Sequence, residues 1–73
     1  MIILDVTDTL FIDDLSVEEA NDWMNTNVGA TIHEAWDYSY GEGWRLEFET
    51  RALRWILQIE EESKAILFQL RWG

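Results

Sequence analysis

The chain of 73 residues contains no cysteine, and it has one histidine and one lysine. The absence of cysteine excludes a disulfide framework and a thiolate metal site, so a hydrophobic core must hold the fold. No apolar run approaches the roughly 18 residues that a membrane-spanning helix needs. The first residues, Met1 to Leu4, meet Asp5 without the basic region of a signal peptide. From these absences we expect a cytoplasmic protein that does not contact a membrane.

Basic residues are missing from the whole stretch before Arg45. Up to Thr50 there are twelve acidic residues and one basic residue, and after it three acidic and four basic ones, which together give the net charge of −10. Such a surface repels nucleic acid and attracts basic protein surfaces through long-range electrostatic steering. The expected partner is therefore the basic surface of another protein, without direct contact to nucleic acid.

The composition is nevertheless that of a folded chain, with 48% hydrophobic and 14% aromatic residues. Its length leaves room for a single acidic domain over residues 1–73. Each tryptophan can bury roughly 150–250 Å², which partly offsets the small size. The five tryptophans are Trp23, Trp36, Trp44, Trp55 and Trp72.

The N-terminal segment predicts a strand over Ile2–Val6, with alternate apolar residues on one face. Apolar character resumes at residues 10–12, and Asp8 interrupts the alternation between them. Asp8 indicates either a turn between two short strands or a bulge.

A helix is predicted from about Ser16 to Val28. The sequence Ser16-Val17-Glu18-Glu19 fits a capping box, in which the Ser16 hydroxyl accepts from the Glu19 amide and the Glu19 carboxylate reaches back. Leu15 and Ala20 would form a hydrophobic staple, and Gly29 would supply a left-handed cap. Apolar residues recur at helical spacing at Val17, Ala20, Trp23, Met24 and Val28.

The middle of the chain favours strands. Thr31–Tyr40 is predicted as one strand, and the turn Gly41-Glu42-Gly43 leads into a second strand from Trp44 to Glu49. The first strand would place on one face Ile32, Trp36, Tyr38 and Tyr40. The second alternates apolar and charged residues, which is typical of an antiparallel sheet with one solvated face.

The C-terminal part predicts one more strand and one more helix. Leu53–Ile59 reads as a strand with Leu53, Trp55, Leu57 and Ile59 inward, although Arg51–Glu60 is also compatible with a helix. A helix is expected over about Glu61–Arg71, because acids at its start and Arg71 at its end suit the helix dipole. The predicted fold class is α+β, an antiparallel sheet of about four strands with two helices on one face.

The last ten residues, KAILFQLRWG, resemble the C-termini of small uncharacterised proteins of tailed bacteriophages, which carry a segment like A-x-L-F-x-L-R-W. The resemblance covers about the last fourteen residues. It implies a phage or prophage gene product and brings no activity and no functional residue with it. Phages encode many short acidic inhibitors of host enzymes and defence systems, which favours that class by analogy.

The segment ILDVTDTL around Asp5 looks like the first motif of the haloacid-dehalogenase phosphatases and P-type ATPases. The resemblance implies Asp5 as the nucleophile, but Thr7 replaces the usual second aspartate and Asp8 a glycine. That chemistry needs a parallel doubly wound sheet carrying a lysine and further Mg²⁺-binding acids. Lys64 is the sole lysine of a chain too short for such a sheet, so we predict a polar strand end and no enzyme.

Metal and cofactor sites are not predicted either. His33 is the single histidine and is expected on a strand surface. The pair Asp13-Asp14 and the run Glu60–Glu62 lack the spacing of a calcium loop and are expected at a turn and at a helix start. The chain has no P-loop, no dinucleotide fingerprint and no serine elbow. No cofactor is expected.

Two surfaces remain as candidate binding sites. The acids Glu18, Glu19 and Asp22 lie away from the apolar stripe of the first helix, while Glu47 and Glu49 share one face of the hairpin strand, with Asp37 nearby. Rows of carboxylates at such spacing imitate the phosphates of nucleic acid, or they form a solvated face. The aromatic residues around Trp36 and Trp44 belong either to the core or to an interface, which a homodimer would bury.

The hypothesis that follows is a small acidic, phage-encoded binding protein. It would inhibit a host nucleic-acid-binding protein or defence complex by presenting a DNA-like carboxylate surface. The alternative is a structural or accessory module that self-associates through its aromatic surface. Salt separates the two, because a charge-steered complex weakens with ionic strength and an aromatic dimer does not.

Overall fold

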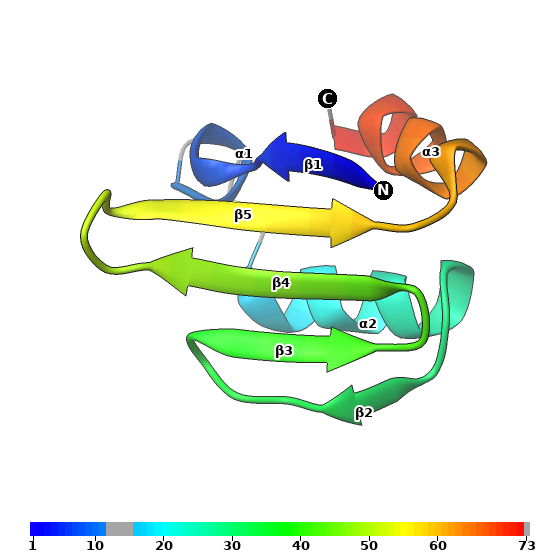
Figure 1. Ribbon diagram of the computed structural model, residues 1–73, viewed down its shortest axis with the longest axis horizontal. Helices are drawn as coiled ribbons and strands as arrows, with labels where there is room; N and C mark the ends of the chain where they lie inside the picture. The colour runs from blue at the N-terminus through cyan, green and yellow to red at the C-terminus, as the bar shows by residue number, and fades with distance from the viewer. Residues whose placement is uncertain (12–15, 73) are drawn as a thin grey trace.

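Five strands form one antiparallel sheet, in the order β1-β5-β4-β3-β2, and helices cover one of its faces (Figure 1). The computed structural model describes residues 1–11 and 16–72. The predicted α+β class is confirmed, with five strands and three helices where about four and two were expected. The elements are β1 (Ile2–Asp5), α1 (Thr7–Phe11), α2 (Val17–Asn27), β2 (Thr31–His33), β3 (Tyr38–Gly41), β4 (Trp44–Glu49), β5 (Arg54–Ile59) and α3 (Glu62–Trp72).

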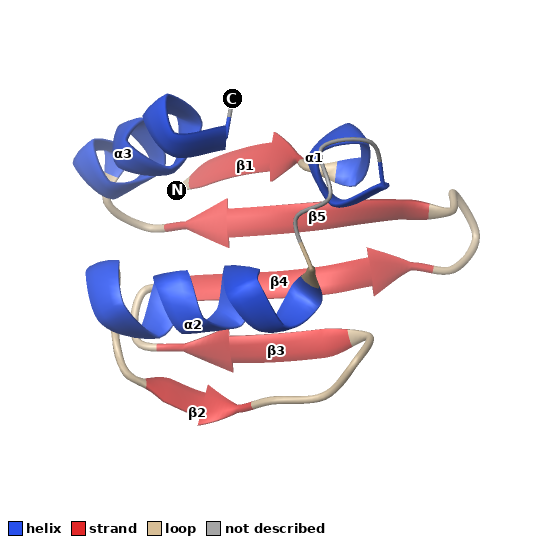
Figure 2. Ribbon diagram, turned by 180° about the vertical axis from the view of Figure 1, so that it is seen from behind, coloured by secondary structure: helices blue, strands red, loops and turns tan. Residues whose placement is uncertain are grey.

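The pairing of the strands arranges their side chains in rows across the sheet, because neighbouring residues of a strand point to opposite faces. α2 and α3 cover one face, and the other is open (Figure 2). One row on the helix side consists of Leu4, Leu57, Leu46 and Ser39. The neighbouring row on the open side consists of Ile3, Gln58, Arg45 and Tyr40. The polar outer face that alternation in residues 44–49 predicted is therefore present.

The tryptophans divide among the core, the contact between two helices and the surface. Trp44 and Trp55 are buried among the apolar residues of the sheet. Trp23 on α2 meets Trp72 and Phe68 on α3, with ring centroids 5.5 Å and 5.6 Å apart in edge-to-face geometry. These aromatic contacts join the two helices over the sheet. Trp36 is 74% exposed.

The predicted Ser16 cap of α2 is confirmed, whereas the predicted left-handed cap at Gly29 is wrong. The Ser16 hydroxyl accepts from the Glu19 amide at 3.0 Å. The expected staple involves Leu15, which lies outside the described residues. At the other end Val28 caps the helix in a right-handed conformation, and Gly29 is not among the residues of positive φ. Gly29 is required for a different reason: a Cβ there would overlap the carbonyl oxygen of Glu42.

Replacing Ser16 by alanine should lower the free energy of unfolding by about 0.5–2 kcal/mol, because the Glu19 amide loses its acceptor. Chemical denaturation followed by circular dichroism measures the change. Ser63→Ala, a change at an exposed position inside α3, is the matched control and should leave the midpoint nearly unchanged. Equal midpoints for Ser16→Ala and the parent would contradict a stabilising cap.

The segment after β1 is a short helix and neither of the two predicted alternatives, a turn between strands or a bulge. Asp8 lies inside α1, which begins at Thr7. The Asp5 carboxylate accepts from the Thr7 amide at 3.0 Å, and the Thr7 hydroxyl accepts from the Trp55 amide at 2.9 Å. These bonds stop β1 and attach the start of α1 to β5. A side chain that bonds the backbone locally competes with continued strand pairing.

Residues 31–40 form two strands and not the single strand predicted. β2 turns back through residues 34–37 and pairs antiparallel with β3, with a register shift between Thr31 and His33. The predicted common face is confirmed for Tyr38 and Tyr40, which lie on the open side, while Ser39 between them points to the core and is 1% exposed. Ile32 and Trp36 lie outside this strand and are 64% and 74% exposed. The turn Gly41-Glu42-Gly43 is confirmed, with a φ of +79° at Gly43.

The last two elements agree with the predictions in type. Of the two alternatives for residues 51–60, the strand is found, with Trp55, Leu57 and Ile59 buried. Leu53 was expected inward but lies in the preceding turn with a φ of +53° and is 67% exposed. α3 spans Glu62–Trp72, close to the predicted bounds. Among the described helices, none combines the length and the apolar character that crossing a membrane requires.

Candidate functional site

The candidate acids lie on two opposite sides of the molecule. Glu18, Glu19 and Asp22 are exposed on α2, which covers one face of the sheet. Glu47 and Glu49 belong to β4 and project from the open face, on the other side of the sheet. Glu49 is part of the single ion pair found within residues 1–11 and 16–72, to Arg54 at 3.3 Å. A partner that lies flat on the α2 surface therefore does not reach Glu47 and Glu49.

The α2 surface, which we define as Glu18, Glu19 and Asp22, has one basic neighbour, because Arg71 lines a cavity together with Glu19 and Asp22. Its three carboxylates have no ion pair with a described residue. Glu18 and Asp22 are four residues apart, which places them on one side of a helix about 5–6 Å from each other at Cβ. On the open face, by contrast, Arg54 pairs with Glu49, and Arg45 lies in the same strand as Glu47.

The loop between β2 and β3 continues the α2 surface. Its residues Glu34 and Ala35 and the exposed Trp36 form a cavity of about 260 Å³ together with residues of α2. The α2 residues that line it are Val17, Glu18 and Asn21. The loop also carries Asp37, whose carbonyl oxygen accepts from the Phe48 amide at 2.8 Å and whose side chain is exposed. Acids from separate parts of the chain thus meet beside an exposed tryptophan.

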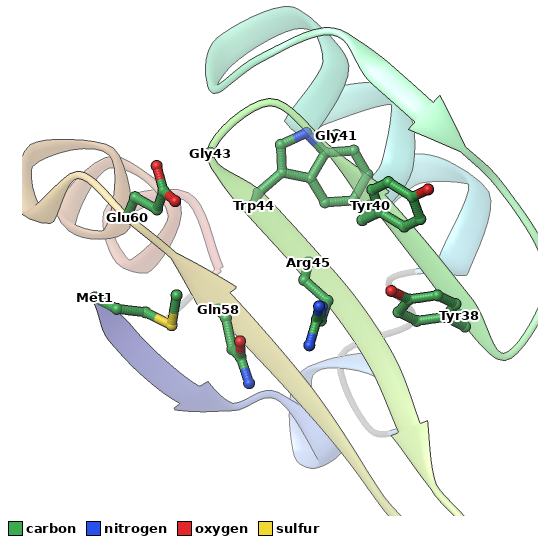
Figure 3. Close-up of a pocket in the computed structure, with 9 residues that line it drawn as sticks. All are labelled: Met1, Tyr38, Tyr40, Gly41, Gly43, Trp44, Arg45, Gln58 and Glu60. Carbon is green, nitrogen blue, oxygen red and sulfur yellow. The ribbon is translucent and has the colours of Figure 1, made fainter.

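The open face carries an aromatic cluster, for which the sequence predicted Tyr38 and Tyr40 on a common face but not the contacts with His33 and Arg45. The His33 ring stacks on Tyr40 at 5.7 Å, Tyr38 lies 5.5 Å from Tyr40, and the Arg45 guanidinium lies 5.7 Å from the Tyr38 ring centroid. Figure 3 shows Arg45 between Tyr38 and Gln58, in a groove of about 580 Å³. The alternation Tyr38-Ser39-Tyr40 predicts that both tyrosines lie on one face of the strand. It does not tell which face of the sheet that is, because this depends on the face that α2 covers.

Trp44 does not belong to an exposed aromatic surface. Its side chain is 4% exposed, and its indole N–H donates to the Gly29 carbonyl at 2.9 Å. The core alternative therefore holds for Trp44, whereas Trp36 projects into solvent. The two tryptophans that the sequence grouped into one binding surface thus have different environments.

Asp5, the residue of the phosphatase resemblance, acts as a helix-capping acid. The Thr7 hydroxyl donates to its carboxylate at 2.6 Å and the Thr7 amide at 3.0 Å. These two bonds, the hydroxyl first, hold the pKa of the Asp5 carboxyl below its ordinary value of 3.8. Asp5 pairs with Ile56 on β5, whereas Lys64 follows the other end of that strand, beyond Ile59. The sheet is antiparallel, so it does not bring Asp5 and Lys64 to a common edge.

His33 is exposed on β2, as expected for a strand-surface histidine, and its ring contacts tyrosines. Within the described part of the chain, no group of three or more histidine and acidic side chains is arranged to hold a metal ion. Of the two acidic runs, Glu60–Glu62 lies at the start of a helix as predicted, with Glu62 as the first residue of α3. Asp13 and Asp14 lie outside the described residues.

Comparison with family models, with curated proteins and with solved structures gives no match to this chain.

Proposed function

We propose that this chain is a small acidic binding protein that inhibits a host nucleic-acid-binding protein or defence complex by occupying its basic surface. The observation that supports this proposal most directly is the α2 surface, where three exposed carboxylates have no ion pair with a described residue. A cationic partner would therefore gain electrostatic energy without breaking an ion pair, although Arg71 lies near Glu19 and Asp22. The net charge of −10 adds long-range attraction and faster association.

The same charge supports nucleic-acid mimicry rather than nucleic-acid binding. Exposed carboxylates spaced along a helix present a polyanion to a protein surface that evolved to bind phosphates. A DNA or RNA strand would itself be repelled by the fifteen acidic residues. The resemblance of the C-terminal segment to phage proteins supports a phage origin, and the cytoplasm of the host cell is then the place of action. No cofactor is needed for this function.

Mimicry predicts competition. Proteins retained from a host lysate by the immobilised chain should be released by excess duplex DNA, because both ligands use one basic surface. Raising the salt from about 50 mM to about 200 mM should weaken the complex steeply, as it does for phosphate contacts. Mass spectrometry of the released fraction identifies the partner. Retention that withstands both DNA and salt would contradict the proposal.

A second candidate function, self-association, is favoured by apolar residues on the outer side of α3. Ile66, Leu67 and Leu70 are 48%, 47% and 78% exposed. These three residues of one helix form an exposed apolar patch, and Trp36 is a separate exposed apolar residue in the β2–β3 loop. Sedimentation equilibrium at low and high salt separates the candidates: a dimer that persists at high salt supports self-association, and a monomer at both supports the acidic binding protein.

A further inference from the structure

Asn21, one of the residues that line the cavity between α2 and the β2–β3 loop, carries a buried polar atom without a partner. Asn21 is 2% exposed, and its side-chain amide donates to the Ser39 hydroxyl at 3.1 Å. That hydroxyl in turn donates to the Ala35 carbonyl at 3.0 Å, so its one proton is already used. The Asn21 Oδ1 atom has no hydrogen-bond partner among the described residues. An unpaired buried acceptor costs free energy, and because Oδ1 is covered by its neighbours, a donor recovers that free energy only if the cavity widens at Asn21.

The charged groups that line this cavity are both carboxylates. Glu18 comes from the first turn of α2 and Glu34 from the loop after β2, and Asn21 lies on the same helix as Glu18. Figure 2 shows the first turn of α2 on the same side of the molecule as the loop that joins β2 to β3. The cavity therefore has two anionic acceptors in its lining and one neutral acceptor buried behind it, an arrangement that suits a cation with several N–H donors.

We propose that this cavity receives an arginine side chain of the partner protein, an inference that rests on the proposed function and specifies how the basic surface is recognised. A guanidinium carries five N–H donors in a planar fork, which matches acceptors that come from different directions. Trp36, 74% exposed, supplies a ring face on which that plane stacks. Val17 and Ala35 supply apolar contact for the aliphatic part of the side chain.

The size of the cavity also favours a side chain. Its volume of about 260 Å³ lies below the range of about 300–1,000 Å³ that is usual for small-molecule sites. Lysine is the weaker candidate, because its ammonium is a compact point charge that does not stack as a plane. The positive end of the α2 dipole opposes any cation, but Glu18 and Glu19 place two full negative charges on the same turn.

The test uses the full chain labelled with ¹⁵N and the probe N-acetyl-arginine amide. Two reporters belong to the cavity: the indole N–H of Trp36 and the side-chain amide of Asn21. We expect saturable shifts of both with the arginine probe and no shifts with the citrulline analogue, which has the same shape without charge. The lysine analogue should bind more weakly than the arginine probe.

Variants separate the cavity from general charge attraction. Trp36→Ala leaves every charge in place and should weaken arginine binding about tenfold, through loss of the stacking ring. Glu34→Gln removes one acceptor and should weaken it similarly. Glu62→Gln, at an exposed position at the start of α3, changes the net charge by the same amount and should leave binding unchanged.

Several outcomes would overturn the arginine site. These are shifts that do not saturate, equal responses to arginine and citrulline, lysine binding as tight as arginine binding, or Trp36→Ala binding like the parent. If the arginine site fails while partner proteins are still released by duplex DNA, the proposed function stands without this cavity. If arginine binds but no captured protein is released by DNA, the cavity stands and the proposed function is wrong.

Discussion

Replacing Glu18, Glu19 and Asp22 together by lysine should abolish capture of the basic partner. Each substitution reverses one exposed charge of the α2 surface, and close charge pairs across protein interfaces contribute coupling of about 1.5–7 kcal/mol. The partner's cations would face lysines where they met carboxylates. Binding is measured by titration of the purified partner at low salt, where the contrast between parent and variant is largest.

The fold should survive this change with a modest loss of stability. The three side chains point away from the buried stripe of α2, which includes Ala20 and Met24. Glu18 and Glu19 interact favourably with the helix N-terminus, at about 0.3–1 kcal/mol each, and lysine there is unfavourable. Circular dichroism and thermal unfolding verify that the variant remains folded under the conditions of the titration.

The matched control, the hairpin variant, places three charge reversals away from the α2 surface, at Glu47 and Glu49 on the open face and at the exposed Glu62 at the start of α3. Net charge changes equally, so any difference between the two variants reports the location of the contact. We expect the hairpin variant to retain most of the affinity, because Glu47 and Glu49 project from the open face of the sheet. If both variants bind as tightly as the parent at low salt, the acidic-mimic proposal is wrong and Trp36 becomes the candidate contact.

The second large effect is expected at Gly29, where alanine should destabilise the protein by about 1–3 kcal/mol. The chain after α2 passes close over the tip of the β3–β4 hairpin, and a Cβ at Gly29 would overlap the Glu42 carbonyl oxygen. The Gly29 carbonyl also accepts from the Trp44 indole at 2.9 Å, and the Glu42 amide donates to Ala30 at 3.0 Å. Any shift that relieves the overlap disturbs these bonds. Urea unfolding measures the difference from the parent.

Asparagine substitutions distinguish two reasons for a glycine: the close approach of another segment, as at Gly29, and a left-handed backbone conformation, as at Gly43. Gly43 has a φ of +79°, and a Cβ there would meet only a side-chain oxygen of Glu60 at an ordinary contact distance of 3.9 Å, so Gly43→Asn should cost little, since asparagine tolerates that conformation. Gly29→Asn should be at least as harmful as Gly29→Ala, because the obstacle is the Glu42 backbone. If Gly29→Asn destabilises the protein only mildly, the overlap explanation is wrong and the left-handed cap predicted at Gly29 is supported.

Much of the local structure was predictable because its determinants are neighbours in the chain. The Ser16 cap, the Gly41–Gly43 turn and the alternation in β4 each depend on residues a few positions apart. The end of α2 was wrong for the opposite reason: Gly29 is explained by a residue thirteen positions away, across the hairpin tip. Local rules carry no information about such a contact.

The candidate site was predictable in its chemistry and not in its geometry. The exposed position of Glu18, Glu19 and Asp22 followed from helical periodicity, and α2 confirms it. The grouping of Trp36 with Trp44 failed, because Trp36 is exposed, whereas Trp44 is buried and donates a hydrogen bond to the Gly29 carbonyl. The cavity at Asn21 was missed altogether, since it joins α2 to a loop more than ten residues further along the chain.

Charge, composition and short-range periodicity by themselves determined an acidic α+β protein with a capped first helix and a hairpin, because these properties are set within a few residues. The tertiary structure decided which side of each strand faces the helices, and therefore that Ser39 lies under α2 while Tyr38 and Tyr40 lie on the open face. It also divided the acids between two surfaces. A strand shows the same alternation whichever face is covered, so only packing against α2 and α3 resolves that choice.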